Sequence, residues 1–237
     1  MEKLLILQHV PHEPPARFAD LAQKFGIQMD ILKLWENYKI PRINEYSRLL
    51  VLGGPQSVYD PLEKYPSKED EINLIKNFNK MKKPVLGICL GGQLMAKAFG
   101  GRVYPNKVQG RLLKETGFYK VQLTENGESA ELFKGFPKSF PVFQWHGDVF
   151  ELPKNAKLLA IGEKARNQAF VYGKLAYGIL FHLEFTPKIV EELVRIDKRW
   201  LHEDNYVNER EIIEGAYKNE ETLKILMERL FNNWLNL

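Results

Sequence analysis

Residues 84–94 restrict the fold more than any other segment and read Pro-Val-Leu-Gly-Ile-Cys-Leu-Gly-Gly-Gln-Leu. An apolar run typical of a buried strand leads into Cys89, and a helical pattern follows it. Gly87 and Gly91 stand two residues before and after the cysteine, so the chain can turn sharply and expose the thiol. The following helix N-terminus favours a thiolate, and the backbone N–H of Leu90 is placed to bind an oxyanion. The segment predicts a cysteine nucleophile elbow, and the alternative is an inert buried cysteine.

Strands and helices alternate through the first half of the chain. Apolar runs bounded by glycine or proline predict strands, and apolar residues three and four apart predict helices. The expected strands are 3–9, 28–34, 47–52 and 84–88, and the expected helices are 16–25, 68–81 and 90–99. Strands that alternate with helices form a parallel sheet with helices on both faces.

The second half of the chain is richer in short β-type segments. They are expected at 117–123, 141–145, 157–161, 169–172 and 176–182, and some of their pairs should be antiparallel. Thr186 and Pro187 begin a helix that is expected to reach about Trp200, with Thr as the N-cap. A last amphipathic helix is expected from about Glu220. Its apolar side is expected to pack on its own domain, and a dimer or partner interface is the alternative.

Composition excludes several classes of protein. The chain has 237 residues and is 44% hydrophobic, so it can bury a full core without disulfides or metal. Residues 1–237 are expected to form one domain, with 188–237 as a C-terminal helical extension. A single cysteine excludes an internal disulfide and a cysteine-rich zinc site.

The same sequence gives no sign of a membrane or nucleic-acid partner. No apolar run approaches the ~18 residues of a membrane span, and a cytoplasmic protein is therefore expected. The net charge is only +4. Basic residues gather between positions 97 and 120 without a nucleic-acid motif, and they are interpreted as a solvated face.

A cysteine nucleophile needs a base, and the base needs a group that orients it. Among the five histidines, His182 ends an apolar β-type run and has a carboxylate at strand spacing. His182 and Glu184 are two residues apart, so in a strand both side chains project from the same face. Alone, this pattern is more often a core histidine beside a surface glutamate. Together with the Cys89 elbow, it predicts the base and its orienting carboxylate.

A glycine pair, Gly53-Gly54, ends the third expected strand. In an open parallel sheet, ligands bind beyond the carboxyl ends of the strands. Bare backbone at that point can approach a ligand and donate a second N–H to an oxyanion. An ordinary strand-to-loop turn is the alternative interpretation.

Taken together, these segments resemble the class I glutamine amidotransferases, in particular the amidotransferase domain of GMP synthase and its stand-alone relatives. The matching segments are 51–60 (VLGGPQSVYD), 84–101 (PVLGICLGGQLMAKAFGG), 114–118 (KETGF), 145–148 (WHGD) and 181–184 (FHLE). The resemblance implies a flavodoxin-like α/β fold. Such a fold is an open, mostly parallel sheet with helices on both faces, here with a small antiparallel strand portion and C-terminal helices.

The resemblance also implies roles for individual residues. By it, Cys89, His182 and Glu184 look like a Cys-His-Glu triad. Gly54 and Leu90 match oxyanion-hole positions beside Gly53, and Gln93 matches a substrate-contacting glutamine. Gln144, Trp145 and His146 match the loop that meets the amino-acid end of the substrate, where His146 is either a site residue or a residue that shapes the loop. Leu180 and Leu183 replace a glutamine and a proline that the family usually carries, so the pocket wall is expected to differ. His9 and Glu13 either rim the site or belong to a surface loop, and the surface-loop interpretation is preferred.

The implied reaction is hydrolysis of the glutamine side-chain amide through a γ-glutamyl thioester on Cys89, without a metal or organic cofactor. Three functions remain open. The chain is either a glutaminase subunit that feeds ammonia to a partner synthase, or a stand-alone hydrolase of γ-glutamyl amides or peptides, which Leu180 and Leu183 mildly favour. The third is a non-enzymatic binding or redox-sensing protein, which would not need His182 and Glu184 at triad spacing.

Overall fold

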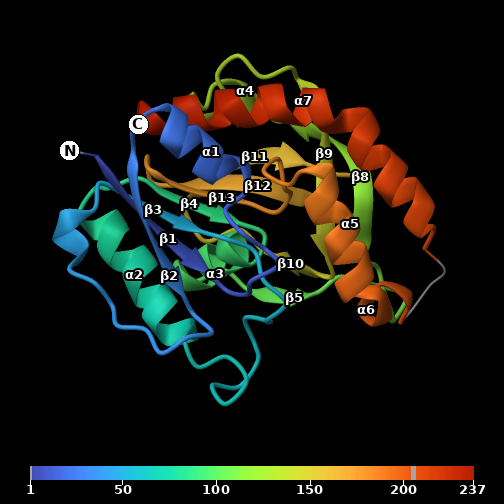
Figure 1. Cartoon of the computed structure of the whole chain (residues 1–237), viewed down its shortest axis with the longest axis horizontal. Coiled ribbons are helices and arrows are strands. Elements are labelled where there is room, and N and C mark those ends of the chain that lie inside the picture. The colour runs from blue at the N-terminus through green and yellow to red at the C-terminus, as the bar shows by residue number, and fades with distance from the viewer. Residues whose placement is uncertain (1, 204–206) are drawn as a thin grey trace.

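A nine-stranded sheet forms the centre of the computed structural model, which describes residues 2–203 and 207–237 (Figure 1). Across the sheet the strands are β2 (Gln28–Lys33), β1 (Lys3–Gln8), β3 (Arg48–Val51), β4 (Val85–Ile88), β13 (Ala176–Ile179), β12 (Asn167–Tyr172), β11 (Ala156–Ile161), β8 (Glu115–Leu123) and β9 (Ser139–His146). The strands from β2 to β13 pair in parallel, and those from β13 to β9 pair antiparallel. Two small antiparallel sheets pair β5 (Val103–Pro105) with β10 (Asp148–Phe150) and β6 (Lys107–Val108) with β7 (Arg111–Leu112).

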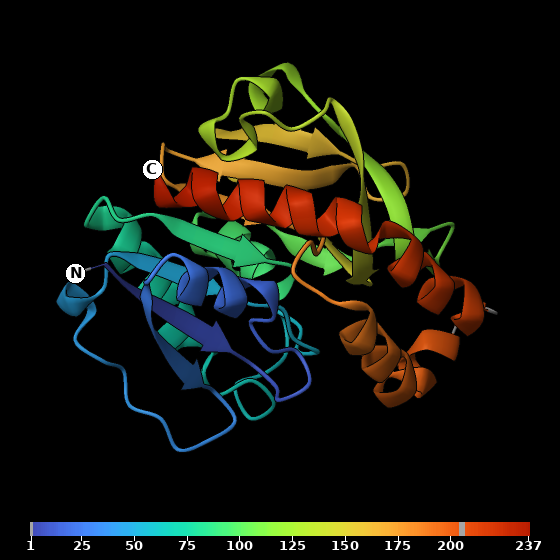
Figure 2. The same ribbon diagram turned by 45° about the horizontal axis from the view of Figure 1, so that its top comes forward.

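Helices cover both faces of the sheet, as the alternating sequence predicts. In β1, Leu4 and Ile6 belong to one buried cluster, and Leu5 and Leu7 to another, because successive strand residues point to opposite faces. The first cluster is covered by α1 (Arg17–Lys24) and α7 (Glu209–Leu235), and the second by α2 (Lys68–Lys80) and α3 (Leu90–Ala98). Figure 2 shows α7 lying across the sheet beside α1. The predicted fold class is confirmed.

The C-terminal helices differ from the predicted boundaries. The helix expected to reach Trp200 stops earlier, as α5 (Pro187–Ile196), and a separate α6 (Lys198–His202) follows. The last helix begins at Glu209 and not near Glu220, because the Asn208 side chain accepts the N–H of Glu211 and caps it. Its apolar side is buried in the same core cluster as α1, which confirms packing on its own chain. Single turns complete the described helices: η1 (Ile43–Glu45), α4 (Glu125–Glu128) and η2 (Glu131–Phe133).

The strand that carries the histidine is shorter than predicted. β13 ends at Ile179, three residues before His182. The chain then leaves the β4 ladder, and His182 forms an isolated bridge with Phe143 of β9. Both backbone hydrogen bonds of that bridge are present, at 2.8 Å and 3.2 Å. His182 is therefore fixed to the antiparallel half of the sheet.

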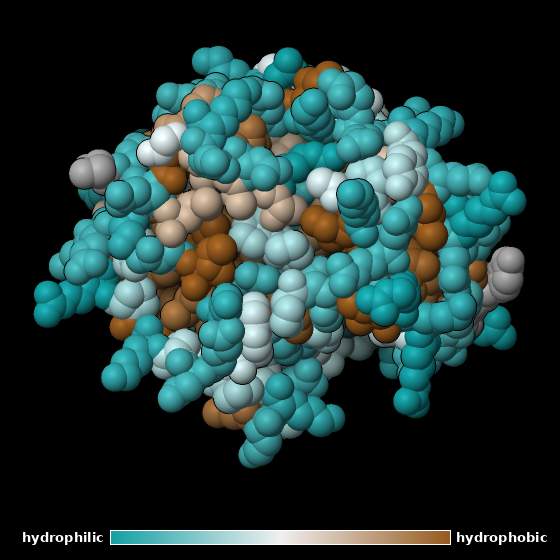
Figure 3. Space-filling view, in the orientation of Figure 1, coloured by the Kyte–Doolittle hydropathy of each residue, from teal (hydrophilic) through white to brown (hydrophobic). Residues whose placement is uncertain are grey.

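Hydrophilic side chains cover much of the surface seen in Figure 3, and hydrophobic ones appear between them. Among the described residues, no helix has the length and apolar character needed to cross a membrane.

Candidate active site

Cys89 lies at the sharp turn between β4 and α3. Its backbone has φ 50° and ψ −107°, a left-handed φ that a residue with a side chain adopts only under tertiary constraint. Hydrogen bonds from the Cys89 N–H to the Ile179 carbonyl at 2.8 Å and from the Gly91 N–H to the Leu52 carbonyl at 3.2 Å hold the turn in place. A Cβ on Gly91 would come within 2.1 Å of the Val51 carbonyl oxygen. Glycine is thus required for α3 to approach β3 so closely.

The His182 ring is held by Glu184. The distance from Nδ1 to Glu184 Oε1 is 2.6 Å, and both side chains are almost fully buried. Glu184 Oε2 accepts the backbone N–H of Leu183 at 3.0 Å. The Arg17 guanidinium at the start of α1 donates to the Phe185 carbonyl, and it therefore fixes the segment that carries the carboxylate. The i, i+2 spacing brings the pair together although the strand has already ended.

The two ionisable groups at the elbow influence each other. Burial raises the pKa of the Cys89 thiol, and a hydrogen bond and charge from His182 and a hydrogen bond from the Leu90 N–H act to lower it. Burial acts to lower the pKa of His182, but the Glu184 charge and hydrogen bonds to Cys89 and Glu184 raise it well above its usual value. Glu184 therefore favours transfer of the thiol proton to the imidazole ring.

Gly53 lies where the side chains of the site converge. A Cβ on Gly53 would be 2.7 Å from Glu13 Oε2, 3.1 Å from His182 Cε1 and 3.6 Å from the Cys89 Cβ. The absence of a side chain at this position leaves room for a ligand beside the thiol. Gly54 follows it and lines the pocket.

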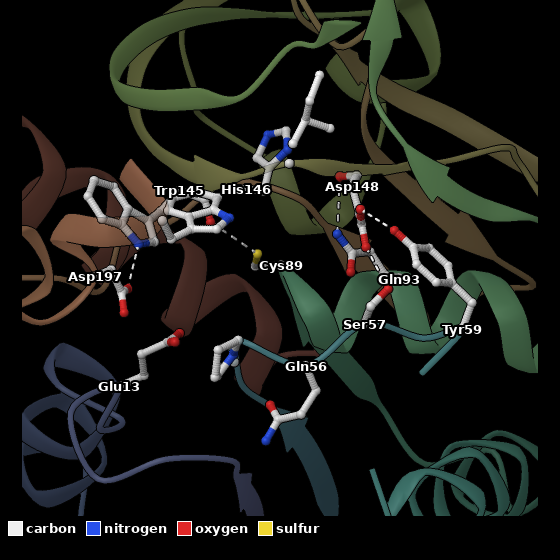
Figure 4. Close-up of a pocket in the computed structure, with 15 residues that line it drawn as sticks. Glu13, Gln56, Ser57, Tyr59, Cys89, Gln93, Trp145, His146, Asp148 and Asp197 are labelled. Atoms are coloured by element: carbon white, nitrogen blue, oxygen red, sulfur yellow. Dashed lines mark hydrogen bonds between the residues drawn. The ribbon is translucent and has the colours of Figure 1, made fainter. Parts of the chain in front are cut away.

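A pocket of about 290 Å³ opens above the thiol (Figure 4). It is lined by Glu13, Gly54, Pro55, Gln56, Ser57, Tyr59, Cys89, Gln93, Leu112, Trp145, His146, Gly147, Asp148, Asp197 and Trp200. The structure thus brings the predicted residues Gly54, Cys89, Gln93, Trp145 and His146 to one cavity. The amide nitrogen of Gln93 donates to the Asp148 carbonyl at 3.1 Å. The Cys89 sulfur lies 3.8 Å from the Trp145 carbonyl oxygen.

Gln144 is placed behind this pocket and not on its wall. Its side chain is fully buried, donates to Gln168 at 2.7 Å and lies 3.1 Å from His146 Nε2. Glu115 Oε2 accepts from Gln168 at 3.0 Å and lies 3.1 Å from His146 Nε2. Gln144, Gln168 and Glu115 thus form a buried polar network that holds the His146 ring from behind.

His9 and Glu13 are not surface residues, so that interpretation was wrong. Their exposed fractions are 2% and 6%, because the loop after β1 folds inward over the carboxyl end of the sheet. His9 Nδ1 bonds the Gly53 carbonyl at 2.8 Å. Burial raises the pKa of Glu13 to about 7, although the charges of His182 and His9 oppose the rise. In Figure 4 the Glu13 carboxylate points into the pocket.

The sequence did not single out two further groups on the pocket wall. Asp148 accepts hydrogen bonds from Ser57 Oγ at 2.7 Å and from the Tyr59 hydroxyl at 2.6 Å. Asp197, at the break between α5 and α6, accepts the Trp145 indole N–H at 3.0 Å. The WHGD and VLGGPQSVYD segments contain three of these residues, so the motifs did mark this wall. The described residues contain no group of three or more His, Cys, Asp or Glu side chains that could hold a metal ion.

Curated relatives match half of the chain or more. The chain is 36% identical over 157 residues to the glutamine amidotransferase-like protein YfeJ of Salmonella typhimurium and 40% identical over 124 residues to a subunit of the glutamine-hydrolyzing GMP synthase of Pyrococcus abyssi. These matches cover 65% and 50% of the chain, and 64% and 62% of the relatives' own lengths. Gamma-glutamyl peptidase 3 of Arabidopsis thaliana is 28% identical over 206 residues, which cover 81% of the chain and 76% of that protein.

A solved structure matches the whole fold. A glutamine amidotransferase from Thermotoga maritima superposes with a TM-score of 0.89 at 34% identity, covering 100% of this chain and 99% of that one. The family model described as glutamine amidotransferase class-I matches residues 18–195. That range holds the elbow, the glycine pair and the His182–Glu184 pair. The chain therefore belongs to the class I glutamine amidotransferase family.

Proposed function

We propose that this protein hydrolyses the side-chain amide of glutamine, with Cys89 as nucleophile, His182 as base and Glu184 as the group that orients the base. One observation carries the proposal. A cysteine held in a left-handed backbone conformation at a helix N-terminus faces a pocket, and a buried histidine–carboxylate pair bonded at 2.6 Å lies beside it. An inert buried cysteine would need none of these features.

The proposed reaction proceeds through a covalent intermediate. His182 takes the thiol proton, and the Cys89 sulfur attacks the amide carbon of glutamine. The backbone N–H groups of Gly54 and Leu90 bind the oxyanion of the tetrahedral intermediate. His182 returns the proton to the leaving nitrogen, and ammonia departs from a γ-glutamyl thioester. Water that has lost a proton to His182 then attacks the thioester and releases glutamate.

The charge of the pocket supports an amino-acid substrate. Asp148 and Asp197 line it together with Glu13, whose pKa is raised to about 7 by burial, and no lysine or arginine is among the described residues on its wall. Such a wall favours the cationic α-ammonium group of a γ-glutamyl compound. Trp145 and Trp200 supply an apolar side, with ring centroids 5.5 Å apart.

The direct test is release of glutamate and ammonia from glutamine by the purified chain and by a Cys89→Ser variant. Serine keeps the size of the side chain but not its thiolate, so hydrolysis should fall by more than about 10³-fold. Ser129→Ala is the matched control and should keep full activity, because Ser129 is exposed and does not line the pocket. Turnover that persists in Cys89→Ser would contradict the proposal.

A second candidate is hydrolysis of γ-glutamyl peptides. The γ-glutamyl peptidase relative matches more of the chain than the two amidotransferase relatives do, and Leu180 and Leu183 stand where the family usually has glutamine and proline. The two functions share the chemistry and differ in the leaving group. A panel of γ-glutamyl dipeptides beside glutamine separates them by kcat/KM.

The fate of ammonia depends on a partner. Because one relative is named as a component of GMP synthase, we propose that an ammonia-accepting synthase is the partner if glutamine is the preferred substrate. We also propose that residues 1–237 act as one domain. Within it, residues 188–237 form a C-terminal extension whose α6 lines the pocket and whose α7 covers one face of the sheet.

A further inference from the structure

A buried histidine–glutamate pair other than His182–Glu184 and His146–Glu115 lies beside the site and has no part in the proposed reaction. His9 Nε2 is 2.7 Å from Glu71 Oε2, and both side chains are completely buried. The Tyr65 hydroxyl is 3.1 Å from the same ring nitrogen, and Ser67 Oγ donates to Glu71 Oε1 at 2.8 Å. Two buried ionisable groups at this depth need such partners, because burying either one alone is costly.

The other nitrogen of the His9 ring reaches the glycine pair. Nδ1 lies 2.8 Å from the Gly53 carbonyl oxygen. A carbonyl oxygen only accepts, so Nδ1 must carry the proton. Glu71 holds the opposite nitrogen and therefore fixes the ring with Nδ1–H aimed at Gly53.

This contact controls the direction of an N–H group in the pocket. The peptide between Gly53 and Gly54 is planar and trans, so the Gly53 C=O and the Gly54 N–H point in opposite directions. While His9 holds the carbonyl, the Gly54 N–H is turned away from His9. Glycine tolerates either sign of φ, so without the contact the peptide can rotate and present an oxygen where negative charge forms.

We propose that His9, fixed by Glu71, is a positioning residue that holds the Gly53–Gly54 peptide with the Gly54 N–H directed at the developing oxyanion. The oxyanion hole is then formed before substrate arrives. The inference rests on the proposed function, because it requires nucleophilic attack by Cys89 on a carbonyl carbon.

The test compares two reactions of Cys89 that differ in their need for an oxyanion hole. Iodoacetamide alkylates the sulfur by displacing iodide, and no oxyanion forms. p-Nitrophenyl acetate acetylates the sulfur through a tetrahedral oxyanion that expels p-nitrophenolate, and it needs no recognition of a γ-glutamyl group. The ratio of the acylation rate to the alkylation rate therefore reports on the oxyanion hole and not on the substrate.

Two double variants form the matched pair. His9→Leu alone would leave the Glu71 carboxylate buried without its partner, so Glu71→Leu accompanies it. His9→Leu/Glu71→Leu has no donor to Gly53, whereas His9→Asn/Glu71→Leu carries an amide N–H close to the position of Nδ1. In the first variant the ratio is expected to fall by ~10²–10³, the effect of losing one oxyanion donor, and in the second it should recover.

The outcomes separate this inference from the proposed function. An unchanged ratio in His9→Leu/Glu71→Leu, equal loss of both reactions, or no recovery with asparagine overturns the positioning role. A wild-type chain that is alkylated but never acylated overturns it as well. A wild-type chain that is acylated yet hydrolyses neither glutamine nor γ-glutamyl peptides overturns the proposed function, and the ratio in the variants still decides the role of His9.

Discussion

At the scale of single residues, Glu13 is placed where its charge is costly. The residue is 6% exposed, and the pKa of its carboxyl rises from 4.5 to about 7, with burial as the largest cause. Between these two values the folded protein keeps a proton that the unfolded chain has lost, so stability falls as the pH rises. The neighbouring charges of His182 and His9 offset only part of this cost.

Replacement of Glu13 by Gln should therefore stabilise the fold at pH 8. A raised pKa of this size corresponds to about 3 kcal/mol, which the wild type loses between about pH 4.5 and pH 7. Urea unfolding of Glu13→Gln and wild type should show a gain near this value at pH 8 and little gain at pH 5. The exposed Glu63→Gln variant serves as control, and a gain of equal size at both pH values would contradict the prediction.

Local residue patterns identified part of the site, and tertiary contacts determined the rest. The Cys89 elbow was visible because its glycines, strand and helix are adjacent in sequence. His182 and Glu184 were visible because two residues separate them. His9 and Glu13 were assigned to a surface loop in preference to the rim of the site, because their burial depends on contacts with Gly53, Glu71 and His182 that no local pattern encodes.

At the scale of elements, α7 packs on the antiparallel half of the sheet. It contacts β8, β9, η2 and α1, and Trp234 near its end is completely buried. A Cβ on Gly215 would lie 2.7 Å from the Phe118 ring, so α7 also approaches β8 closely. The start of α7 could have been predicted, since Asn208 followed by Glu211 is a capping pattern. Ile212 and Ala216 follow this cap at helical spacing, but Gly215 lies between them and disfavours a helix.

Trp234→Ala should destabilise the protein by about 3–5 kcal/mol, because it removes a large side chain from a closed core. Ile225→Ala changes an apolar residue of the same helix that is 50% exposed, and it should cost no more than about 0.5 kcal/mol. Urea unfolding of both variants measures the difference. Equal losses would contradict the prediction that burial of Trp234 stabilises the fold.

At the scale of the whole molecule, the pocket joins parts that are far apart in sequence. Glu13, Gly54 and Cys89 come from the parallel half, Trp145 comes from the antiparallel half, and Trp200 comes from α6. The two tryptophan rings lie 5.5 Å apart. A ligand in the pocket should therefore contact both halves of the sheet and α6.

Binding of glutamine to a Cys89→Ala variant should change the intrinsic tryptophan fluorescence in a saturable way. Adding Trp200→Phe should reduce this change, since Trp200 lines the pocket beside Trp145. Trp35→Phe is the control, because Trp35 follows β2 and does not line the pocket. A signal that survives Trp200→Phe but not Trp35→Phe would contradict the placement of the ligand.

The packing of α7 on α1 also has a consequence for how the chain folds. Lys24 and Glu228 form an ion pair 204 positions apart, and the Phe18 and Phe231 ring centroids are 6.1 Å apart. Contacts of such long range require a large loss of chain entropy before they form. Until α7 docks, the outer side of α1 stays exposed to solvent, and incompletely folded chains present an adhesive apolar surface. The face of the sheet that α1 covers is therefore completed only when α7 docks on it.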